Sequence, residues 1–285
     1  MSFFTIIIPA LNEEKYLPLL LSDLAAQTYQ DFEVIVVNGN SEDDTVANAL
    51  EFESKIKITI LNTSTRNVSH QRNLGGKKAK SPWLVFMDAD NRLPDYYLDG
   101  LRYQLAKNKD TDLFTTLIKT PSNETIDIAV QHIINLSLEL YQKINKPQGF
   151  GAMIGCRKTL FNTIQFNETT TYLEDSTFID DVVKLGHTYT IFRQPRYVYS
   201  LRRFKKEGTI EIIRKGASIQ LDFLQGKRNF TDNRYPMLGG TYYEDKPEKG
   251  FLYNVNSLQN FFKKASKKQI DHARKLLRLI KIDSD

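Results

Sequence analysis

Short apolar runs alternate with helical periodicities along the first 95 residues of the chain. Buried strands are predicted by runs of apolar and β-branched residues at 4–8, 32–37, around Ile58 and Ile60, and at 83–87. Apolar residues three and four positions apart predict helices between these strands, at about 17–24, 42–50 and 69–79. Strands that alternate with helices in this way form a mostly parallel sheet with helices on both faces, so the pattern predicts an α/β fold.

The alternation continues with longer elements up to about residue 208. Strands are predicted at 113–118, 152–156 and 197–200, and helices at about 98–105 and at 176–185. A long amphipathic helix at 126–144 is expected to pack on the sheet through Ile126, Val130, Ile133, Leu140 and Ile144. Gly149 and Gly151 lie on either side of Phe150, just before residue 152. This segment is either a plain turn or a loop that lets a sugar ring approach the backbone.

The stretch WLVFMDADNRLP at 83–94 carries the most informative chemistry. Five apolar residues end in Asp88 and Asp90, so both carboxylates lie where a buried strand opens to solvent. Residues two apart on an extended segment point the same way, and Ala89 between them needs little space. The two carboxylates can therefore converge on one divalent cation. An ordinary acidic turn before Pro94 is the alternative that these residues leave open.

Polar clusters follow three of the predicted strands, at 9–13, 38–41 and 88–91. Ligands of open α/β sheets bind at the carboxyl ends of strands, so one crevice is expected to collect all three clusters. No GxGxxG follows the first strand, and GxxxxGK[ST] does not occur in the chain. These absences argue against a dinucleotide-binding Rossmann enzyme and a P-loop enzyme, whereas a nucleotide held by other means stays compatible with the sequence.

Two charged pairs stand out in the second half of the chain. Glu174 and Asp175 directly precede the helix predicted at 176–185, so both lie at a helix N-terminus. Helix capping alone would explain Asp175. Arg202 and Arg203 follow the last predicted strand, and paired arginines suit a bidentate grip on a diphosphate.

Composition indicates a globular protein with a sizeable core, since 41% of the 285 residues are hydrophobic and 26% are charged. The single cysteine, Cys156, excludes an internal disulfide and a four-cysteine zinc site, and we expect it to be a small buried hydrophobe. Neither a signal peptide nor a membrane span is expected from the apolar stretches. Surface or packing roles, rather than metal binding, are expected for the scattered histidines His70, His132, His187 and His272.

The net charge of +5 is unevenly distributed. Residues 1–200 carry 20 Lys and Arg against 24 Asp and Glu, whereas residues 201–285 carry 19 against 10. At 263–280 the cations flank an apolar stripe, which predicts a basic amphipathic helix. Such a helix can lie on an anionic membrane surface or pack on the rest of the chain with its cations in water. No nucleic acid partner is expected.

Taken in order, seven motifs resemble those of the family 2 glycosyltransferases, which have the GT-A fold. They are TIIIPALNEEKYL at 5–17, FEVIVVNGNSEDDT at 32–45, RNVSHQRNLGGKKAK at 66–80, LVFMDADNRLP at 84–94, GFGAMIGCRKTLF at 149–161, YLEDSTFIDDVVKLGH at 172–187 and SLRRFKKEG at 200–208. Their order and spacing resemble the family's over about residues 3–208. The resemblance implies an inverting transfer of a sugar from a nucleoside-diphosphate donor, assisted by Mn2+ or Mg2+.

The resemblance also implies roles for individual residues. The nucleoside would be bordered by Pro9, Ala10 and Glu13, the base by Asn38 and Asn40, and the base or phosphates by Arg72. Asp88 and Ala89 would meet the donor at the ribose side, and Asp90 together with Asp88 would hold the metal. Asp175 would be the general base, with Glu174 contacting the acceptor or the donor sugar, and Arg202 and Arg203 would steady the leaving diphosphate.

One position departs from the family's pattern. The loop after the second strand usually carries an aspartate that accepts a hydrogen bond from the base, whereas this chain reads Asn38-Gly39-Asn40. An asparagine can accept through its carbonyl or donate through its amide, so a preference for uracil does not follow.

We therefore expect a GT-A catalytic domain at 1–208 and a helical and loop extension at 209–285. The nucleotide-sugar half would span about 1–95 and the acceptor half about 96–208. The first hypothesis is a metal-dependent transfer to a hydroxyl of a lipid-linked or polysaccharide acceptor of the cell envelope, in the cytoplasm or peripherally at the inner membrane face. The alternative is a non-catalytic GT-A scaffold that binds a nucleotide or glycan. A nucleotidyltransferase also needs paired carboxylates, but it accounts less well for the paired arginines.

Overall fold

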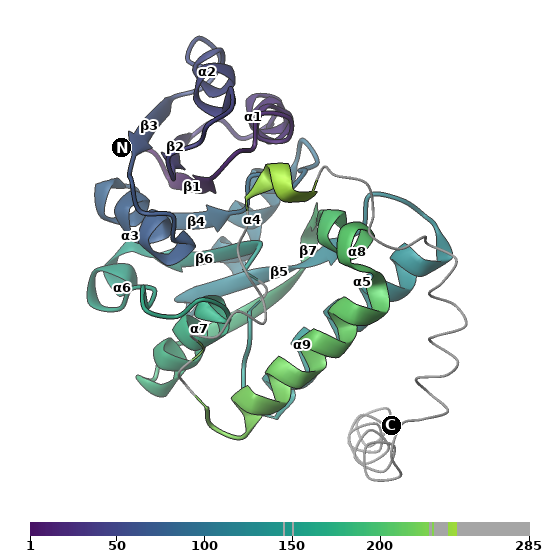
Figure 1. Cartoon of the computed structure of the whole chain (residues 1–285). Helices are drawn as coiled ribbons and strands as arrows, with labels where there is room; N and C mark the ends of the chain where they lie inside the picture. Colours follow the sequence, from purple (N-terminus) through teal and green to yellow (C-terminus); the bar gives the residue numbers. More distant parts are fainter. Residues whose placement is uncertain (145, 150, 228–229, 231–238, 244–285) are drawn as a thin grey trace.

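The chain folds around a seven-stranded mixed sheet (Figure 1). The computed structural model describes residues 1–144, 146–149, 151–227, 230 and 239–243. The strands are β1 (Phe4–Ala10), β2 (Phe32–Asn38), β3 (Ile58–Asn62), β4 (Trp83–Met87), β5 (Leu113–Lys119), β6 (Met153–Arg157) and β7 (Tyr189–Val198). Their order is β3-β2-β1-β4-β6-β5-β7, and β6 runs antiparallel to both of its neighbours while the other pairs are parallel. The predicted α/β fold with a mostly parallel sheet is confirmed.

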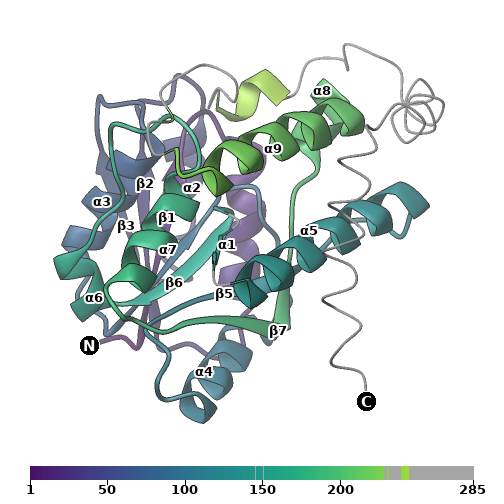
Figure 2. The ribbon, with the colours of Figure 1, turned by 90° about the horizontal axis from the view of Figure 1, so that it is seen from below.

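Helices cover both faces of this sheet (Figure 2). They are α1 (Leu17–Ala25), α2 (Thr45–Leu50), α3 (Val68–Lys78), α4 (Tyr97–Lys107), α5 (Thr125–Lys143), α6 (Lys158–Thr163), α7 (Glu174–Lys184), α8 (Arg202–Glu207) and α9 (Thr209–Leu224), with a short 3₁₀ helix η1 (Gly240–Tyr243). The six-residue helices α6 and α8 are additions to the elements that the sequence pattern predicted.

The sheet separates two hydrophobic cores. Alternate residues of a strand point to opposite faces, so Ile6 and Ile8 join the core under α1, α4 and α5, whereas Ile7 joins the core under α6 and α7. Cys156 is fully buried in this second core with a free thiol, as the sequence predicted.

Helix α5 packs on the sheet through a different face from the predicted one. Val130 is buried as expected, but Ile133 is 51% exposed and Ile144 37% exposed. Asn135 lies on the buried face instead, where its amide accepts from the backbone N–H of Ile118 at 2.9 Å and donates to the carbonyl of Ile118 at 3.0 Å. The pairing of β5 with β7 shifts register at this point, so the backbone needs a side-chain partner that an apolar residue could not supply.

The chain after residue 208 begins with α9, in agreement with the predicted helical start of the extension. The basic amphipathic helix predicted at 263–280 lies outside the described residues. Within the part of the chain that the structure describes, no helix combines the length and the apolar character needed to cross a membrane.

Gly155, in the middle of β6, offers a test of how tightly the sheet is packed. A Cβ atom at this position would lie 2.1 Å from Cζ of the buried Phe114 ring. We expect Gly155→Ala to lower the free energy of unfolding by about 1–3 kcal/mol, because the ring would have to leave its rotamer. Urea unfolding measures this difference.

Gly216 is the matched control, since a Cβ there, in α9, would meet nothing within 4 Å. Gly216→Ala should raise the free energy of unfolding by about 0.4–1 kcal/mol. Equal stability of Gly155→Ala and the unmodified protein would mean that Phe114 can move aside without cost.

Candidate active site

The carboxyl ends of β1 and β2 meet at one edge of the sheet, and the loops that follow them are joined there. The backbone N–H of Gly39 donates to the carbonyl of Ala10 at 2.9 Å. The buried Gln71 side chain donates to the carbonyls of Ala10 and Val37 at 3.0 and 2.7 Å. Asp88 follows β4, the other neighbour of β1, so the three polar clusters lie at the same edge of the sheet, where the ligand crevice of an α/β fold is expected.

Arg72, on α3, is the centre of the acidic part of this crevice. Its side chain is only 2% exposed, and its Nη1 donates to Oε1 of Glu174 at 2.7 Å. Nη2 donates to Oδ1 of Asp88 at 3.2 Å and to the carbonyl of Gly151 at 2.8 Å. One guanidinium thus joins three segments that lie far apart in the sequence. Its predicted contact with the base or phosphates stays a prediction.

Asp175 lies beside this cluster in the first turn of α7 (Glu174–Lys184). Leu173 is the N-cap residue, with a left-handed backbone (φ 56°) and no capping hydrogen bond from its side chain. Asp175 is therefore not the cap, and its Oδ1 accepts from the N–H of Ser176 at 2.6 Å. Burial, followed by the charge of Glu174, raises the pKa of Asp175 to about 7. A carboxyl with this pKa can take up a proton near neutrality.

The turn that carries Asp88 and Asp90 is fixed by Ala152, the residue before β6. The N–H of Asp88 donates to the carbonyl of Ala152 at 3.1 Å, and the amide of Asn91 donates to the same carbonyl at 2.6 Å. Desolvation raises the pKa of Asp88 to about 6, with Arg72 acting in the opposite direction and Asp90 in the same direction. Ala89, between the two carboxylates, is buried.

Arg202, at the start of α8, faces Asp90 rather than open solvent. Its Nε donates to Oδ2 of Asp90 at 3.0 Å, and its Nη2 donates to Oε1 of Glu13 at 2.8 Å. The guanidinium carbon lies 4.0 Å from the centre of the Tyr16 ring. Burial raises the pKa of Glu13 to about 8, against the lowering effect of Arg202. Arg202 is thus the cation that balances the carboxylates on this side of the crevice.

The residues of this corner suit a hard divalent cation. Asp90 is held by a guanidinium, which indicates that the site needs positive charge, and Asp88 supplies a second carboxylate two residues away. In the described residues, no group of three or more His, Cys, Asp or Glu side chains could hold a metal alone. Mg2+ and similar ions are commonly bound by one or two carboxylates plus water and substrate phosphates, so the two aspartates fit such an ion.

At the carboxyl end of β2, the side chain of Asn38 is bonded within the protein. Asn38 is buried, its Oδ1 accepts from the N–H of Ser41 at 3.0 Å, and its amide donates to Oδ1 of Asn62 at 2.9 Å. Asn40 is exposed and has a left-handed backbone with φ 65°. Asn62, at the end of β3, is a neighbour that the sequence did not identify, because a single polar residue at a strand end carries no motif.

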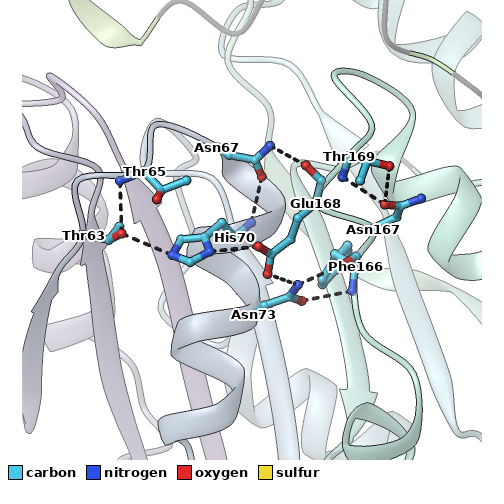
Figure 3. A network of polar contacts seen from close by, with 9 residues as sticks. All are labelled: Thr63, Thr65, Asn67, His70, Asn73, Phe166, Asn167, Glu168 and Thr169. Carbon is cyan, nitrogen blue, oxygen red and sulfur yellow. Dashed lines mark hydrogen bonds and ion pairs between the residues drawn. The ribbon is translucent and has the colours of Figure 1, made fainter.

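A polar network fastens α3 to the segment that leads to α7 (Figure 3). Asn67 caps α3 and its amide donates to the carbonyl of Glu168 at 3.1 Å, while Nδ1 of His70 lies 2.9 Å from Oε2 of Glu168. Asn73 donates to the carbonyl of Phe166 and to Oε1 of Glu168, both at 2.8 Å. The helix that carries Arg72 is thereby fixed relative to Glu174 and Asp175. His70 belongs to this polar network, since its Nε2 also lies 3.2 Å from Oγ1 of Thr63.

Arg203, the next residue of α8, contacts Tyr243 and Glu207. Its Nε donates to the hydroxyl of Tyr243 at 2.9 Å and lies 3.6 Å from Oε1 of Glu207. Pro9 is buried at the end of β1, next to Ala10.

A groove of about 620 Å³ lies at the opposite edge of the sheet, away from the candidate site residues. Its lining includes Phe3, Trp83 and Arg157.

Comparison with known proteins decides the family. Residues 5–165, more than half of the chain, match the model of the family described as Glycosyl transferase family 2. The chain belongs to glycosyl transferase family 2. The resemblance seen in the motifs is confirmed, and the chain forms a glycosyltransferase domain with the GT-A fold. The matched residues end before α7, so Asp175 and Arg202 lie outside them.

Among curated proteins, the chain is 25% identical over 209 residues to a teichoic acid poly(glycerol phosphate) polymerase of Staphylococcus epidermidis, a match that covers 69% of this chain and 28% of the polymerase. Among solved structures, Staphylococcus aureus TarS 1-349 in complex with UDP-GlcNAc has a TM-score of 0.58 at 23% identity, covering 70% of this chain and 58% of that one. Mannosyltransferase PcManGT from Pyrobaculum calidifontis, in complex with GDP-Man and Mn2+, has a TM-score of 0.64 at 16% identity, covering 99% and 81%.

The raised pKa of Asp175 leads to a prediction about stability. A carboxyl whose pKa rises from 3.8 to about 7 on folding stabilises the protein at low pH and loses this contribution as the pH rises through that range. Asp175→Asn cannot ionise, so its melting temperature should exceed that of the unmodified protein by an amount that grows between about pH 4 and about pH 7. Thermal unfolding in metal-free buffers measures the gap. A gap that is the same at every pH would contradict a buried, protonated Asp175.

Proposed function

We propose that this glycosyltransferase moves a sugar, with inversion, from a nucleoside-diphosphate sugar to a hydroxyl of a polysaccharide or lipid-linked acceptor. The observation that carries the proposal is the shared contact of Arg72 with Asp88 and Glu174, next to Asp175. This contact supports a common site for Asp88, on the proposed donor side, and for Asp175, the candidate general base. Membership of glycosyl transferase family 2 supports the reaction class.

Asp175 is the residue proposed to act on the acceptor. Oδ1 accepts from the N–H of Ser176, and the backbone of Gly151 also hydrogen-bonds to the carboxylate. Because each carboxylate oxygen has two lone pairs, the second oxygen, Oδ2, can still accept the proton of the attacking hydroxyl. A Cβ atom at Gly151 would lie 3.1 Å from this second oxygen, so glycine keeps the approach to it open. Glu174 stays paired with Arg72 and orients the cluster rather than moving a proton.

The other side of the site, around Asp90 and Arg202, is proposed to stabilise the departing diphosphate. Asp90 and Asp88 would hold Mn2+ or Mg2+, which supplies positive charge to the diphosphate when it is bound. Arg202 would turn from Asp90 to the phosphate oxygens, and Arg203 would add a second guanidinium. The solved mannosyltransferase in complex with GDP-Man and Mn2+ supports a role for a divalent metal.

The acceptor class rests on the relatives. This chain resembles a teichoic acid poly(glycerol phosphate) polymerase and a poly(ribitol-phosphate) beta-N-acetylglucosaminyltransferase, and both names refer to polymers of polyol phosphates. The present chain corresponds to 28% of the first protein and 16% of the second, so it shares only one part of each. A cell-envelope polysaccharide or its lipid-linked precursor is therefore the proposed acceptor.

A non-catalytic GT-A scaffold is the second candidate. It is favoured by Asn38, because the side-chain amide of this residue is engaged with Ser41 and Asn62 instead of being open to a base. Tight, metal-dependent binding of a nucleotide without transfer or hydrolysis of any nucleotide sugar would support the scaffold over the enzyme.

Asp175→Asn tests the proposed base. The substitution should lower kcat by about 10²–10⁴-fold, since general base catalysis contributes roughly this factor, and should leave the affinity for the donor nucleotide nearly unchanged. Initial rates and calorimetry with the same nucleotide measure the two quantities. Asp181→Asn, an exposed aspartate on the same helix, is the control and should keep full activity. An active Asp175→Asn enzyme would show that another group removes the proton.

A panel of UDP, GDP, CDP and dTDP, each with and without Mn2+, tests the donor site. We expect at least one of them to raise the melting temperature, and to do so more strongly with Mn2+, because binding to the native state stabilises it by mass action. A nucleotide at a concentration of about 100 times its Kd should raise the free energy of unfolding by about 2.7 kcal/mol. If none of the four nucleotides stabilises the protein, the donor-site assignment is wrong.

A further inference from the structure

A short segment beyond the family-matched residues contacts the donor side of the crevice. The 3₁₀ helix η1 (Gly240–Tyr243) lies beside α8 and over the loop that follows β1 (Figure 1). The N–H of Gly240 donates to the carbonyl of Leu11 at 2.9 Å. A Cβ atom at Gly240 would lie 2.2 Å from the carbonyl oxygen of Asn12, so this contact requires a glycine.

Tyr243, at the end of η1, touches both arginines of α8. Its ring centre lies 5.6 Å from the guanidinium carbon of Arg202 and 5.2 Å from that of Arg203. Its hydroxyl accepts from Nε of Arg203 at 2.9 Å and also from Nη2. Tyr16 lies on Arg202 as well, so this guanidinium is in contact with two tyrosine rings.

Arg202 carries one donor that awaits an acceptor. Its side chain is 11% exposed, and among the described residues its Nη1 has no hydrogen-bond partner, although Nε and Nη2 are bonded to Asp90 and Glu13. A buried guanidinium donor without a partner is rare and calls for an acceptor-only group, such as a phosphate oxygen.

We propose that Tyr243 is a positioning residue for the diphosphate, acting through Arg202 and Arg203. This inference rests on the proposed function, which makes the two arginines the cationic grip on the leaving group. An arginine side chain loses much rotational freedom when it binds a phosphate, and a ring face that holds it beforehand reduces this cost. Tyr243 restricts both side chains at once, by its ring and by its hydroxyl.

The proposal separates the phosphate that the arginines reach from the rest of the nucleotide. Tyr243 touches neither the carboxylates at Asp88 and Asp175 nor the loop at Asn38 in any contact seen in the described residues. Removal of the Tyr243 side chain should therefore weaken the binding of a nucleoside diphosphate and leave the binding of the corresponding monophosphate nearly unchanged. A purely structural role would weaken both to the same extent.

The test compares Tyr243→Ala, Tyr243→Phe and the control Tyr242→Phe in the full chain. Calorimetry in Mn2+ measures Kd for the nucleoside diphosphate that most stabilises the unmodified protein, and for its monophosphate. Tyr243→Ala should raise Kd for the diphosphate by about tenfold, through loss of ring and hydroxyl contacts. Tyr243→Phe keeps the ring and should raise it by only about threefold. Tyr242→Phe, which loses the neighbouring hydroxyl, should change neither Kd.

Kinetics with the matching nucleotide sugar give a second readout. The KM for the donor should rise in the order Tyr242→Phe, Tyr243→Phe, Tyr243→Ala. Equal Kd values for Tyr243→Ala and the unmodified protein, or equal losses for mono- and diphosphate, would overturn the role of Tyr243 while the proposed function stands. If Tyr243→Ala does not fold, the difference between the two phenylalanine variants decides. Failure of the unmodified protein to bind any nucleoside diphosphate would overturn the proposed function and this inference together.

Discussion

The guanidinium of Arg72 is the contact on which the candidate active site depends. Glu174, Asp88 and Asp175 would repel one another if they were brought together without a counter-ion, and a buried carboxylate that lacks a partner is costly. Arg72 lies between two of them and also binds a backbone carbonyl, so three remote segments are held by one side chain. The raised pKa values of Asp88 and Asp175 indicate that a single cation does not fully offset the desolvation of this cluster. Additional positive charge on the donor side would complete the balance.

The parts of the site that could be predicted from the sequence are those fixed by local pattern. Asp88 and Asp90 end an apolar run, and Glu174 precedes a helical period, so both acidic clusters were predicted at element ends. The face of α5 could not be predicted, because Asn135 is buried to satisfy a backbone interruption in a strand that only the fold brings near. The role of Tyr243 could not be predicted either, because its contacts with α8 link residues about 40 positions apart and leave no periodic signal in the sequence.

The glycines of α3 illustrate how a weak local signal reflects a tertiary demand. Gly75 and Gly76 lower helix propensity, yet they lie three and four positions after Arg72 and hence on the same face of the helix. A Cβ at Gly75 would lie 2.5 Å from Cγ2 of Ile7, and one at Gly76 would lie 2.4 Å from the Phe161 ring. Gly75 lets α3 lie close on strand β1, and Gly76 lets it lie close on helix α6, so that Arg72 reaches the carboxylates. The glycines lower the intrinsic stability of α3 but allow the position that the Arg72 guanidinium occupies.

The antiparallel direction of β6 determines which groups line the edge of the sheet that holds the candidate site. A parallel strand would deliver its carboxyl end and the side chains that follow it, whereas β6 pairs Met153 with Met87 and so delivers the residues that precede it. Main-chain oxygens of Gly151 and Ala152 thereby become acceptors for Arg72, Asp88 and Asn91. Such acceptors do not depend on residue identity. This rim of the crevice can therefore diverge in sequence between relatives while presenting the same electrostatic lining, provided that position 151 stays small.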